Sequence, residues 1–141
     1  MVATNYKINL ACLVDDDNAY TYSAKKILKD SPVFKNYIIF NDALGAIKHF
    51  KDVANDAAKI PDVLFLDVNM PMMDGWDFLD EFAKIKPSLQ KNVTIYMVST
   101  SINPVDIERA KTISDVAQYI VKPINIEQFE KIFKYFDIEA A

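Results

Sequence analysis

Residues that could do chemistry stand directly after short apolar runs at four places in the sequence. They are Asp15, Asp16 and Asp17 after residues 8–14, Asp67 after residues 63–66, Ser99 and Thr100 after residues 93–98, and Lys122 after residues 118–121. Carboxylates that crowd together repel one another, and each becomes easier to protonate. A hard divalent cation relieves that repulsion, and Mg²⁺ binds carboxylate oxygens while sharing an oxygen of a phosphate group. These residue types therefore indicate a metal site that receives a phosphoryl group.

Asp67 differs from the other acids because four large apolar residues lead straight into it. A strand that is buried on both faces is rigid, and rigidity positions a reacting group. We therefore interpret Asp67 as an attacking carboxylate that forms an aspartyl phosphate. Lys122 supplies a compact positive charge and Ser99 a hydrogen-bond donor for the same group. Phosphoryl transfer needs positioning and charge neutralisation above all, and these residues provide both.

The runs that carry these residues alternate with helical patterns along the chain. Strands are predicted at residues 8–14, 37–40, 63–66, 93–98 and 118–121, and helices at residues 18–29, from Asn41 or Asp42, from Gly75, at 103–113 and from about Asn125. This alternation predicts an α/β fold with a parallel sheet and helices on both faces. Ligands bind such sheets outside the carboxyl ends of the strands. If the first and third strands are neighbours, Asp15, Asp16 and Asp67 converge there.

The helical patterns also predict which side chains cap and bury each helix. Asp17 or Asn18 is expected to cap the first helix, and residues 86–92 are predicted to form a loop. The second helix is expected to bury Ala43, Leu44, Ile47 and Phe50, and the last helix Ile126, Phe129, Ile132, Phe133 and Phe136. Asp74 is expected to form a turn or start a helix, and Met70, Met72 and Met73 are expected to pack within a loop.

Composition limits the class of protein and its partners. The 141 residues, 51% of them hydrophobic, suit one domain with a full core, with no second domain expected for output. The net charge of −4 and the lack of a long basic stretch predict no nucleic-acid partner. The single cysteine, Cys12, lies in an apolar run, which suits a buried thiol in a reducing cytoplasm. No segment has the length of a membrane span.

The sequence lacks the residues that two common kinds of active site require. Its two glycines, Gly45 and Gly75, form neither a G-x-G-x-x-G motif nor a P-loop, which disfavours a dinucleotide or nucleoside triphosphate site. Nucleophilic Ser/His/Asp chemistry needs a histidine near the nucleophile. The one histidine, His49, is predicted on a helix flank, away from the strand ends.

Four motifs, taken together in their order and spacing, resemble those of a known family. LVDDD, LDVNMPMMDG, MVSTS and YIVKP resemble the receiver domain of bacterial two-component response regulators, of the chemotaxis-regulator type. The resemblance covers roughly residues 7–136 of a single domain spanning 1–141. It implies a flavodoxin-like, doubly wound (βα)5 three-layer sandwich with five parallel strands in the order 2-1-3-4-5.

The resemblance also implies roles for the acidic residues. Asp67 would accept a phosphoryl group from a phosphohistidine on a sensor histidine kinase or a histidine phosphotransfer protein. Asp16 and Asp67 would bind Mg²⁺ (or Mn²⁺) directly, and Asp15 would act largely through water. The backbone carbonyl of Asn69 would be a further metal ligand.

Other residues match the family's switch. Ser99 matches the family's switch serine or threonine, Tyr119 its switch aromatic residue and Lys122 its invariant lysine. The Lys122–Pro123 peptide bond would be cis. Phosphorylation would draw Ser99 inward and let Tyr119 rotate, which would change a surface that binds an unidentified downstream protein. By residue type alone, Tyr119 is better explained as a strand residue that packs on its neighbours, and only the resemblance favours a switch role.

Some positions depart from the family pattern and leave an alternative open. Thr100 is larger than the family's usual residue beside the site, and Asp115-Val116 replaces the usual Gly-Ala before the fifth strand. The alternative to a phosphorylation switch is a degenerate or constitutive receiver that acts only as a protein-binding module. An aspartate-nucleophile phosphatase is disfavoured, because it needs a general acid where this chain has Asn69.

Overall fold

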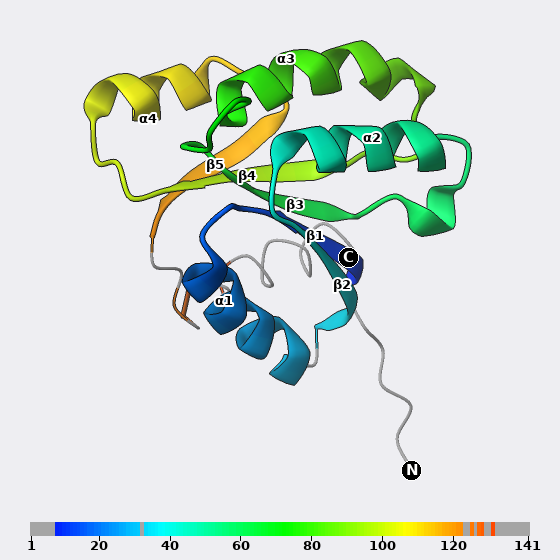
Figure 1. Ribbon diagram of the computed structural model, residues 1–141, viewed down its shortest axis with the longest axis horizontal. Helices are drawn as coiled ribbons and strands as arrows, with labels where there is room; N and C mark the ends of the chain where they lie inside the picture. The colour runs from blue at the N-terminus through cyan, green and yellow to red at the C-terminus, as the bar shows by residue number, and fades with distance from the viewer. Residues whose placement is uncertain (1–7, 32, 123–124, 126, 129–130, 132–141) are drawn as a thin grey trace.

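The computed structural model describes residues 8–31, 33–122, 125, 127–128 and 131, and within them the chain forms one parallel five-stranded sheet (Figure 1). The strands are β1 (Ile8–Val14), β2 (Phe34–Phe40), β3 (Val63–Asp67), β4 (Thr94–Ser99) and β5 (Val116–Val121). The helices are α1 (Asn18–Asp30), α2 (Ala43–Val53), α3 (Gly75–Ile85) and α4 (Pro104–Lys111), with short 3-10 helices η1 (Ala57–Lys59) and η2 (Lys86–Ser88). The strand order β2-β1-β3-β4-β5 confirms the predicted topology.

The sheet separates two apolar clusters, and β3 contributes to both. Helices α2, α3 and α4 cover one face and α1 lies on the other (Figure 1). Leu64 and Leu66 pack into the cluster under α2 and α3, and Val63 and Phe65 pack into the cluster that includes α1. All five residues of β3 are buried, so the strand that ends in Asp67 is held from both sides.

Aspartate caps begin three of the helices close to the carboxyl edge of the sheet. Asp17 accepts a hydrogen bond from the Tyr20 backbone N–H, which confirms the predicted cap of α1. Asp42 caps α2 in the same way. Asp74 caps α3 and exchanges two hydrogen bonds with Asp77, forming a capping box. These caps fix where each helix starts relative to the strand before it.

Three details differ from the sequence predictions. β2 begins at Phe34, three residues before the predicted start. Leu44 is 55% exposed, so its predicted burial is wrong. The buried stripe of α2 starts at Ala43 and continues at three- and four-residue steps, which leaves Leu44 pointing away from the sheet. Part of the predicted loop 86–92 is the 3-10 helix η2.

Two further predictions fall outside the described residues. These are the apolar face of the last helix at 126, 129, 132, 133 and 136, and the cis peptide bond at Lys122–Pro123. The described residues nearby include Asn125 and Gln128, whose side chains and backbone N–H groups exchange two hydrogen bonds.

The described helices are short. The longest, α1, has 13 residues, whereas a helix that crosses a bilayer needs about 20 apolar residues. Within the described ranges, no helix combines the length and the apolar character that a membrane crossing requires. Cys12 is buried in β1, and burial raises the pKa of its thiol, as expected for a packed structural residue.

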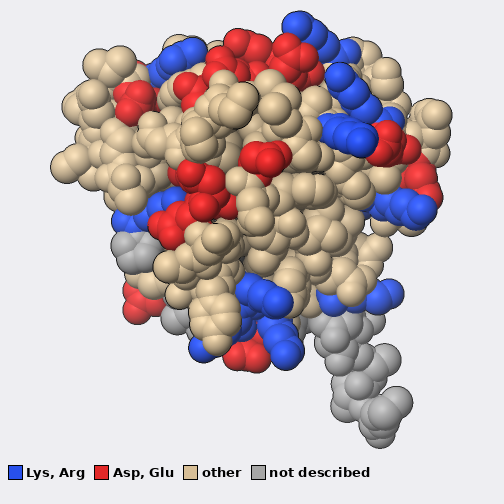
Figure 2. Space-filling view, in the orientation of Figure 1, with Lys and Arg blue, Asp and Glu red and all other residues tan. Residues whose placement is uncertain are grey.

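Charged side chains are mixed on the face of the molecule shown in Figure 2. Lys and Arg occur there in separate small groups among Asp and Glu, which suits the net charge of −4. Binding to a nucleic-acid backbone needs several clustered cations. Among the described residues on this face, no continuous basic strip is present.

Candidate functional site

Three aspartates meet where β1 and β3 end side by side. Val14 of β1 pairs with Leu66 of β3, so the residues that follow them leave the sheet at the same edge. Asp15, Asp16 and Asp67 each offer a carboxylate oxygen, and these oxygens all lie within 4.8 Å of one another. Asp15 and Asp67 are buried and Asp16 is exposed. The structure therefore brings together the three acids that the sequence singled out.

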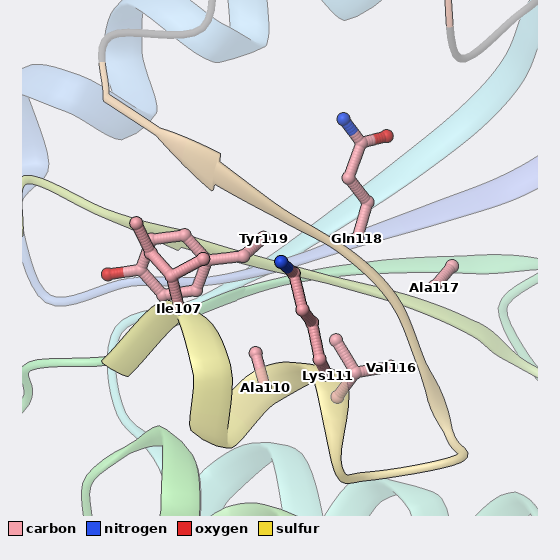
Figure 3. Close-up of a pocket in the computed structure, with 7 residues that line it drawn as sticks. All are labelled: Ile107, Ala110, Lys111, Val116, Ala117, Gln118 and Tyr119. Atoms are coloured by element: carbon pink, nitrogen blue, oxygen red, sulfur yellow. The ribbon is translucent and has the colours of Figure 1, made fainter. Parts of the chain in front are cut away.

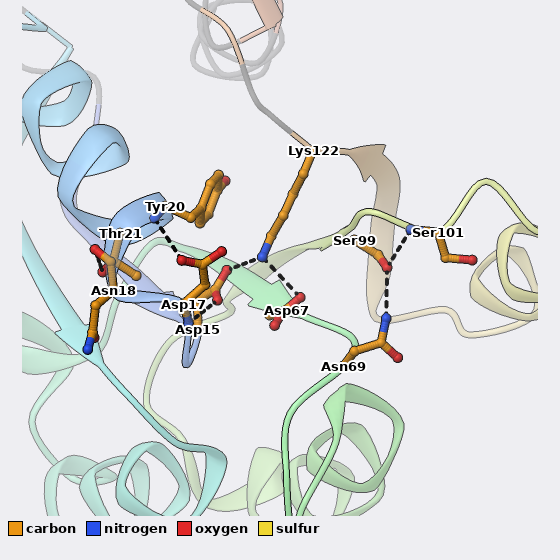
Figure 4. Close-up of polar contacts among 10 residues, drawn as sticks. All are labelled: Asp15, Asp17, Asn18, Tyr20, Thr21, Asp67, Asn69, Ser99, Ser101 and Lys122. Atoms are coloured by element: carbon orange, nitrogen blue, oxygen red, sulfur yellow. Dashed lines mark hydrogen bonds and ion pairs between the residues drawn. The ribbon is translucent and has the colours of Figure 1, made fainter.

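Lys122 follows β5 at the same edge of the sheet and joins this cluster. Its Nζ atom lies 2.7 Å from Asp15 Oδ2 and 3.4 Å from Asp67 Oδ1 (Figure 4). Because β4 lies between β3 and β5, the side chain reaches across the end of β4. Its backbone N–H donates to the carbonyl of Ser99, which fixes the Lys122 backbone at the end of β4. One ammonium group thus bridges two buried carboxylates.

The site is short of positive charge when no metal is bound. Burial, followed by the charge of Asp15, raises the pKa of Asp67 to about 7, although Lys122 acts to lower it. Burial lowers the pKa of Lys122, but its hydrogen bonds and the charges of Asp15 and Asp67 outweigh that effect and raise it. Among the described residues, Lys122 forms ion pairs with two of the three clustered carboxylates. The hard oxygen atoms of these acids are the donors that Mg²⁺ and Mn²⁺ prefer. The donor set fits a divalent cation.

Ser99 lies next to the acids at the end of β4 and is fully buried. Its Oγ accepts hydrogen bonds from the Asn69 side-chain amide, at 3.3 Å, and from the Ser101 backbone N–H, at 3.1 Å (Figure 4). Asn69 stands two residues after Asp67, so the loop that follows the acid also contacts the hydroxyl. The Asp67 backbone and the Ser99 hydroxyl are therefore connected through the short loop that contains Asn69.

Tyr119 lies on β5 and reaches the loop after β4. Its hydroxyl donates to the carbonyl of Ser101 at 2.9 Å, and the Ser101 hydroxyl donates to Asp106 of α4. Tyr119 also lines a hollow of about 200 Å³ between α4 and β5 (Figure 3). Sequence reasoning missed Ser101, although it closes the MVSTS motif two residues after Ser99. Through its backbone, Ser101 joins Tyr119 to Ser99.

The structure shows what surrounds the two positions that depart from the family pattern, Thr100 and Asp115. Thr100 is exposed and lines a hollow of about 370 Å³ together with Asp17, Ala19, Tyr20, Ser23 and Lys122. Asp115 forms an ion pair with Lys86, which ties the turn before β5 to η2. Among the described residues, Met72 alone of the non-glycines has a positive φ, so the turn at Asp115 forms with ordinary backbone angles.

The loop between β3 and α3 returns close to the strand end. The Gly75 backbone N–H donates to the Val68 carbonyl at 2.8 Å. Met70 is buried and Met73 packs against the core, as predicted for loop packing. Met72 is 93% exposed, so that prediction is wrong for this residue. Its φ of 69° turns the chain sharply and points the side chain outward.

We expect Met72→Asn to raise the free energy of unfolding by about 0.5 kcal/mol, because asparagine tolerates the left-handed region better than methionine does. Met72→Val should instead lower it by about 1 kcal/mol, since β-branched residues rarely adopt this conformation. Urea denaturation of the three proteins measures both changes. Equal stabilities for all three would show that the backbone here is not strained.

Comparison with known proteins agrees with this architecture. The model of the response regulator receiver domain family matches residues 11–134. Response regulator Rcp1 of Synechocystis sp. is 28% identical over 121 residues, which are 85% of this chain and 80% of Rcp1. The sensor histidine kinase CheAY of Helicobacter pylori is 30% identical over 83 residues, which are 59% of this chain but only 10% of the kinase.

Solved structures share the fold. A two-component response regulator from Cytophaga hutchinsonii has a TM-score of 0.83 at 21% identity, covering 93% of this chain and 98% of that one. The Mn(2+)-bound form of response regulator Rcp1 has a TM-score of 0.70 at 25% identity, covering 92% of this chain and 91% of that one. Because the family match extends over residues 11–134 and the strand order agrees, this chain belongs to the response regulator receiver domains, the signalling switches of two-component systems.

Proposed function

We propose that Asp67 accepts a phosphoryl group from a phosphohistidine in a divalent-metal-dependent reaction, and that this modification switches a protein-binding surface. The donor would be a sensor histidine kinase or a histidine phosphotransfer protein, since receiver domains interact with histidine kinases. The observation that carries the proposal is the convergence of Asp15, Asp16 and Asp67 within 4.8 Å, with Lys122 bridging two of them.

The residues of the site suit the transfer step. An Oδ atom of Asp67 would attack the phosphorus and form the O–P bond, while the P–N bond to histidine breaks and its electron pair stays with the imidazole. Lys122 would offset the negative charge on the phosphoryl oxygens, and its contact of 3.4 Å with Asp67 keeps it within reach. The buried β3 holds Asp67 still during the attack.

Asp15, Asp16 and Asp67 would hold Mg²⁺ or Mn²⁺, together with the backbone carbonyl of Asn69. When bound, the cation would neutralise negative charge on the acids and on the phosphoryl oxygens. The donor set of three clustered carboxylates supports this assignment. The similar protein Rcp1 has been solved in its Mn(2+)-bound form.

The hydrogen bonds around Ser99 suggest how the signal would leave the site. To donate to a phosphoryl oxygen, Ser99 would turn away from the amide of Asn69 and the N–H of Ser101. Ser101 would then shift, and Tyr119 donates to the carbonyl of that residue. Loss of this contact would free Tyr119 to rotate and would reshape the hollow between α4 and β5, where a downstream protein would bind.

Acetyl phosphate with Mg²⁺ is expected to add one phosphoryl group to the protein, because Asp67 is the attacking carboxylate. Asp67→Asn should abolish the addition, and removal of the metal with a chelator should slow it strongly. Intact-mass spectrometry measures each result. Asp17→Asn is a matched control, since Asp17 caps α1 and is not one of the three clustered acids, and it should still be modified.

An unchanged mass for the parent protein under these conditions would contradict the proposal. It would favour the alternative of a degenerate receiver that binds partners without phosphorylation. Addition that persists in Asp67→Asn would instead place the modified residue elsewhere.

A further inference from the structure

An aromatic ring contacts the lysine of the site. The Lys122 Nζ atom lies over the ring of Tyr20, 4.4 Å from its centroid. This distance is within the range in which a cation is attracted to the face of an aromatic ring. Figure 4 shows Tyr20 beside Lys122, on the α1 side of the acids. Within the described part of the chain, the ammonium group therefore contacts the Tyr20 ring, Asp15 and Asp67.

The start of α1 fixes the position of this ring. Tyr20 is in the first turn of the helix, and its backbone N–H donates to the capping carboxylate of Asp17 at 3.1 Å. The chain segment between the acids and the ring is thus short and held by a hydrogen bond. Burial, followed by the charges of Asp15 and Asp67, raises the pKa of the Tyr20 phenol. The ring therefore meets the lysine as a neutral aromatic face.

We propose that Tyr20 is a positioning residue that holds the Lys122 ammonium group on Asp15 and Asp67 while the metal is absent. The lysine and a divalent cation would compete for the same carboxylate oxygens, so the ring sets how strongly the lysine competes. This inference rests on the proposed function in one respect, namely that Asp15 and Asp67 are metal ligands. Tyr20 would thereby weaken metal binding while keeping Lys122 placed for the phosphoryl group.

The same helix carries a second contact of the same kind that serves as a control. Lys26 lies over the ring of Tyr22 at 4.5 Å from its centroid, four residues along α1. Tyr22 is 62% exposed, and Lys26 is exposed as well. Replacing Tyr22 removes a cation–π contact from α1 without touching the lysine of the site.

Nuclear magnetic resonance of the metal-free protein tests the contact itself. The methylene protons next to Nζ of Lys122 should resonate upfield of ordinary lysines, because they lie near the face of the Tyr20 ring. Tyr20→Phe should keep this shift, and Tyr20→Leu and Tyr20→Met should lose it. Lys122→Gln identifies the resonance by removing it.

Isothermal titration calorimetry with MgCl₂ at neutral pH tests the consequence. Tyr20→Leu and Tyr20→Met should bind Mg²⁺ about threefold more tightly than the parent protein, since a cation–π contact of this kind stabilises the competing lysine. Tyr20→Phe and Tyr22→Leu should bind it as the parent does. Two ring-free variants are included so that a folding defect in one, seen by circular dichroism, leaves the other to decide.

Unchanged or weaker Mg²⁺ binding in the ring-free variants would overturn the proposal, as would an ordinary Lys122 resonance in the parent. Neither readout uses phosphorylation. If acetyl phosphate left the parent unmodified while the Lys122 shift and the Mg²⁺ affinities behaved as expected, the proposed function would fail and the role of Tyr20 would stand.

Discussion

The metal-free protein is expected to lose about 2 to 3 kcal/mol of its free energy of unfolding as the pH rises from about 5 to about 8. The reason is Asp67, whose pKa burial and the charge of Asp15 raise to about 7 in the folded state. In the unfolded chain this carboxyl has an ordinary pKa of about 4. Between these two values the folded protein binds a proton that the unfolded chain does not, so stability falls as the pH rises.

Asp67→Asn should remove most of this dependence, because an amide has no charge to bury at any pH. At about pH 8 the variant should be more stable than the parent by about 2 kcal/mol, and at about pH 5 the two should be nearly equal. Urea denaturation in a chelating buffer across this range measures both. A saturating concentration of Mg²⁺ should recover much of the lost stability of the parent at high pH, because the cation binds only the folded cluster.

Asp16→Asn is the matched control. Asp16 belongs to the same cluster but is exposed, and its charge affects the pKa of Asp67 less than burial, Asp15 or Lys122 does. The pH dependence of this variant should stay close to that of the parent. A parent protein whose stability is flat between about pH 5 and about pH 8 would contradict the expectation, and so would an Asp67→Asn variant that follows the parent.

Gly75→Ala is expected to lower the free energy of unfolding by about 2 kcal/mol and to slow the proposed phosphorylation of Asp67 by at least about tenfold. A Cβ atom at Gly75 would lie 2.6 Å from the Asp67 carbonyl oxygen and 2.9 Å from the Val68 Cα atom. Both are backbone atoms at the end of β3, so neither can rotate away. The strand end or the start of α3 must shift, and either movement displaces the acid.

Gly45→Ala provides the comparison, since Gly45 also lies near the start of a helix. Its added Cβ would meet Oδ1 of Asp42 at 2.9 Å, which is the end of a side chain, and its next neighbours are 3.8 Å away. The better helix propensity of alanine should offset a disturbed cap, so stability should change by less than about 0.5 kcal/mol. Urea denaturation and the initial rate of acetyl phosphate labelling measure these effects. Equal behaviour of the two variants would show that the close approach at Gly75 is not required.

Local patterns in the sequence were enough to predict a parallel sheet with helices on both faces, whereas its strand order came from the family resemblance. Continuous apolar runs that end in polar residues locate all five strands. A parallel strand covered on both faces has no solvent-exposed side, so its sequence needs no alternating polar residues. Alternation with helical spacing then restricts the fold to a parallel sheet, and such sheets present their strand ends on one edge. That rule places Asp15 and Asp67 on the same edge, and they converge because β1 and β3 are neighbours, an order that only the family resemblance implied. The Asp17 cap was predicted for a similar reason, since capping depends on residues close in sequence.

Features that depend on distant parts of the chain needed the tertiary structure. Lys122 could be placed at the correct edge, but its contact with Asp15 at 2.7 Å depends on a side chain that crosses β4. The contact between Tyr20 and Lys122 joins residues about a hundred positions apart, so no local pattern encodes it. Met72 was misjudged because its exposure follows from the path of the loop rather than from its apolar side chain. The sequence by itself thus determined which groups reach the edge of the sheet, because the apolar runs that form the strands are local. Only the fold decided which of these groups touch, because those contacts join separate elements.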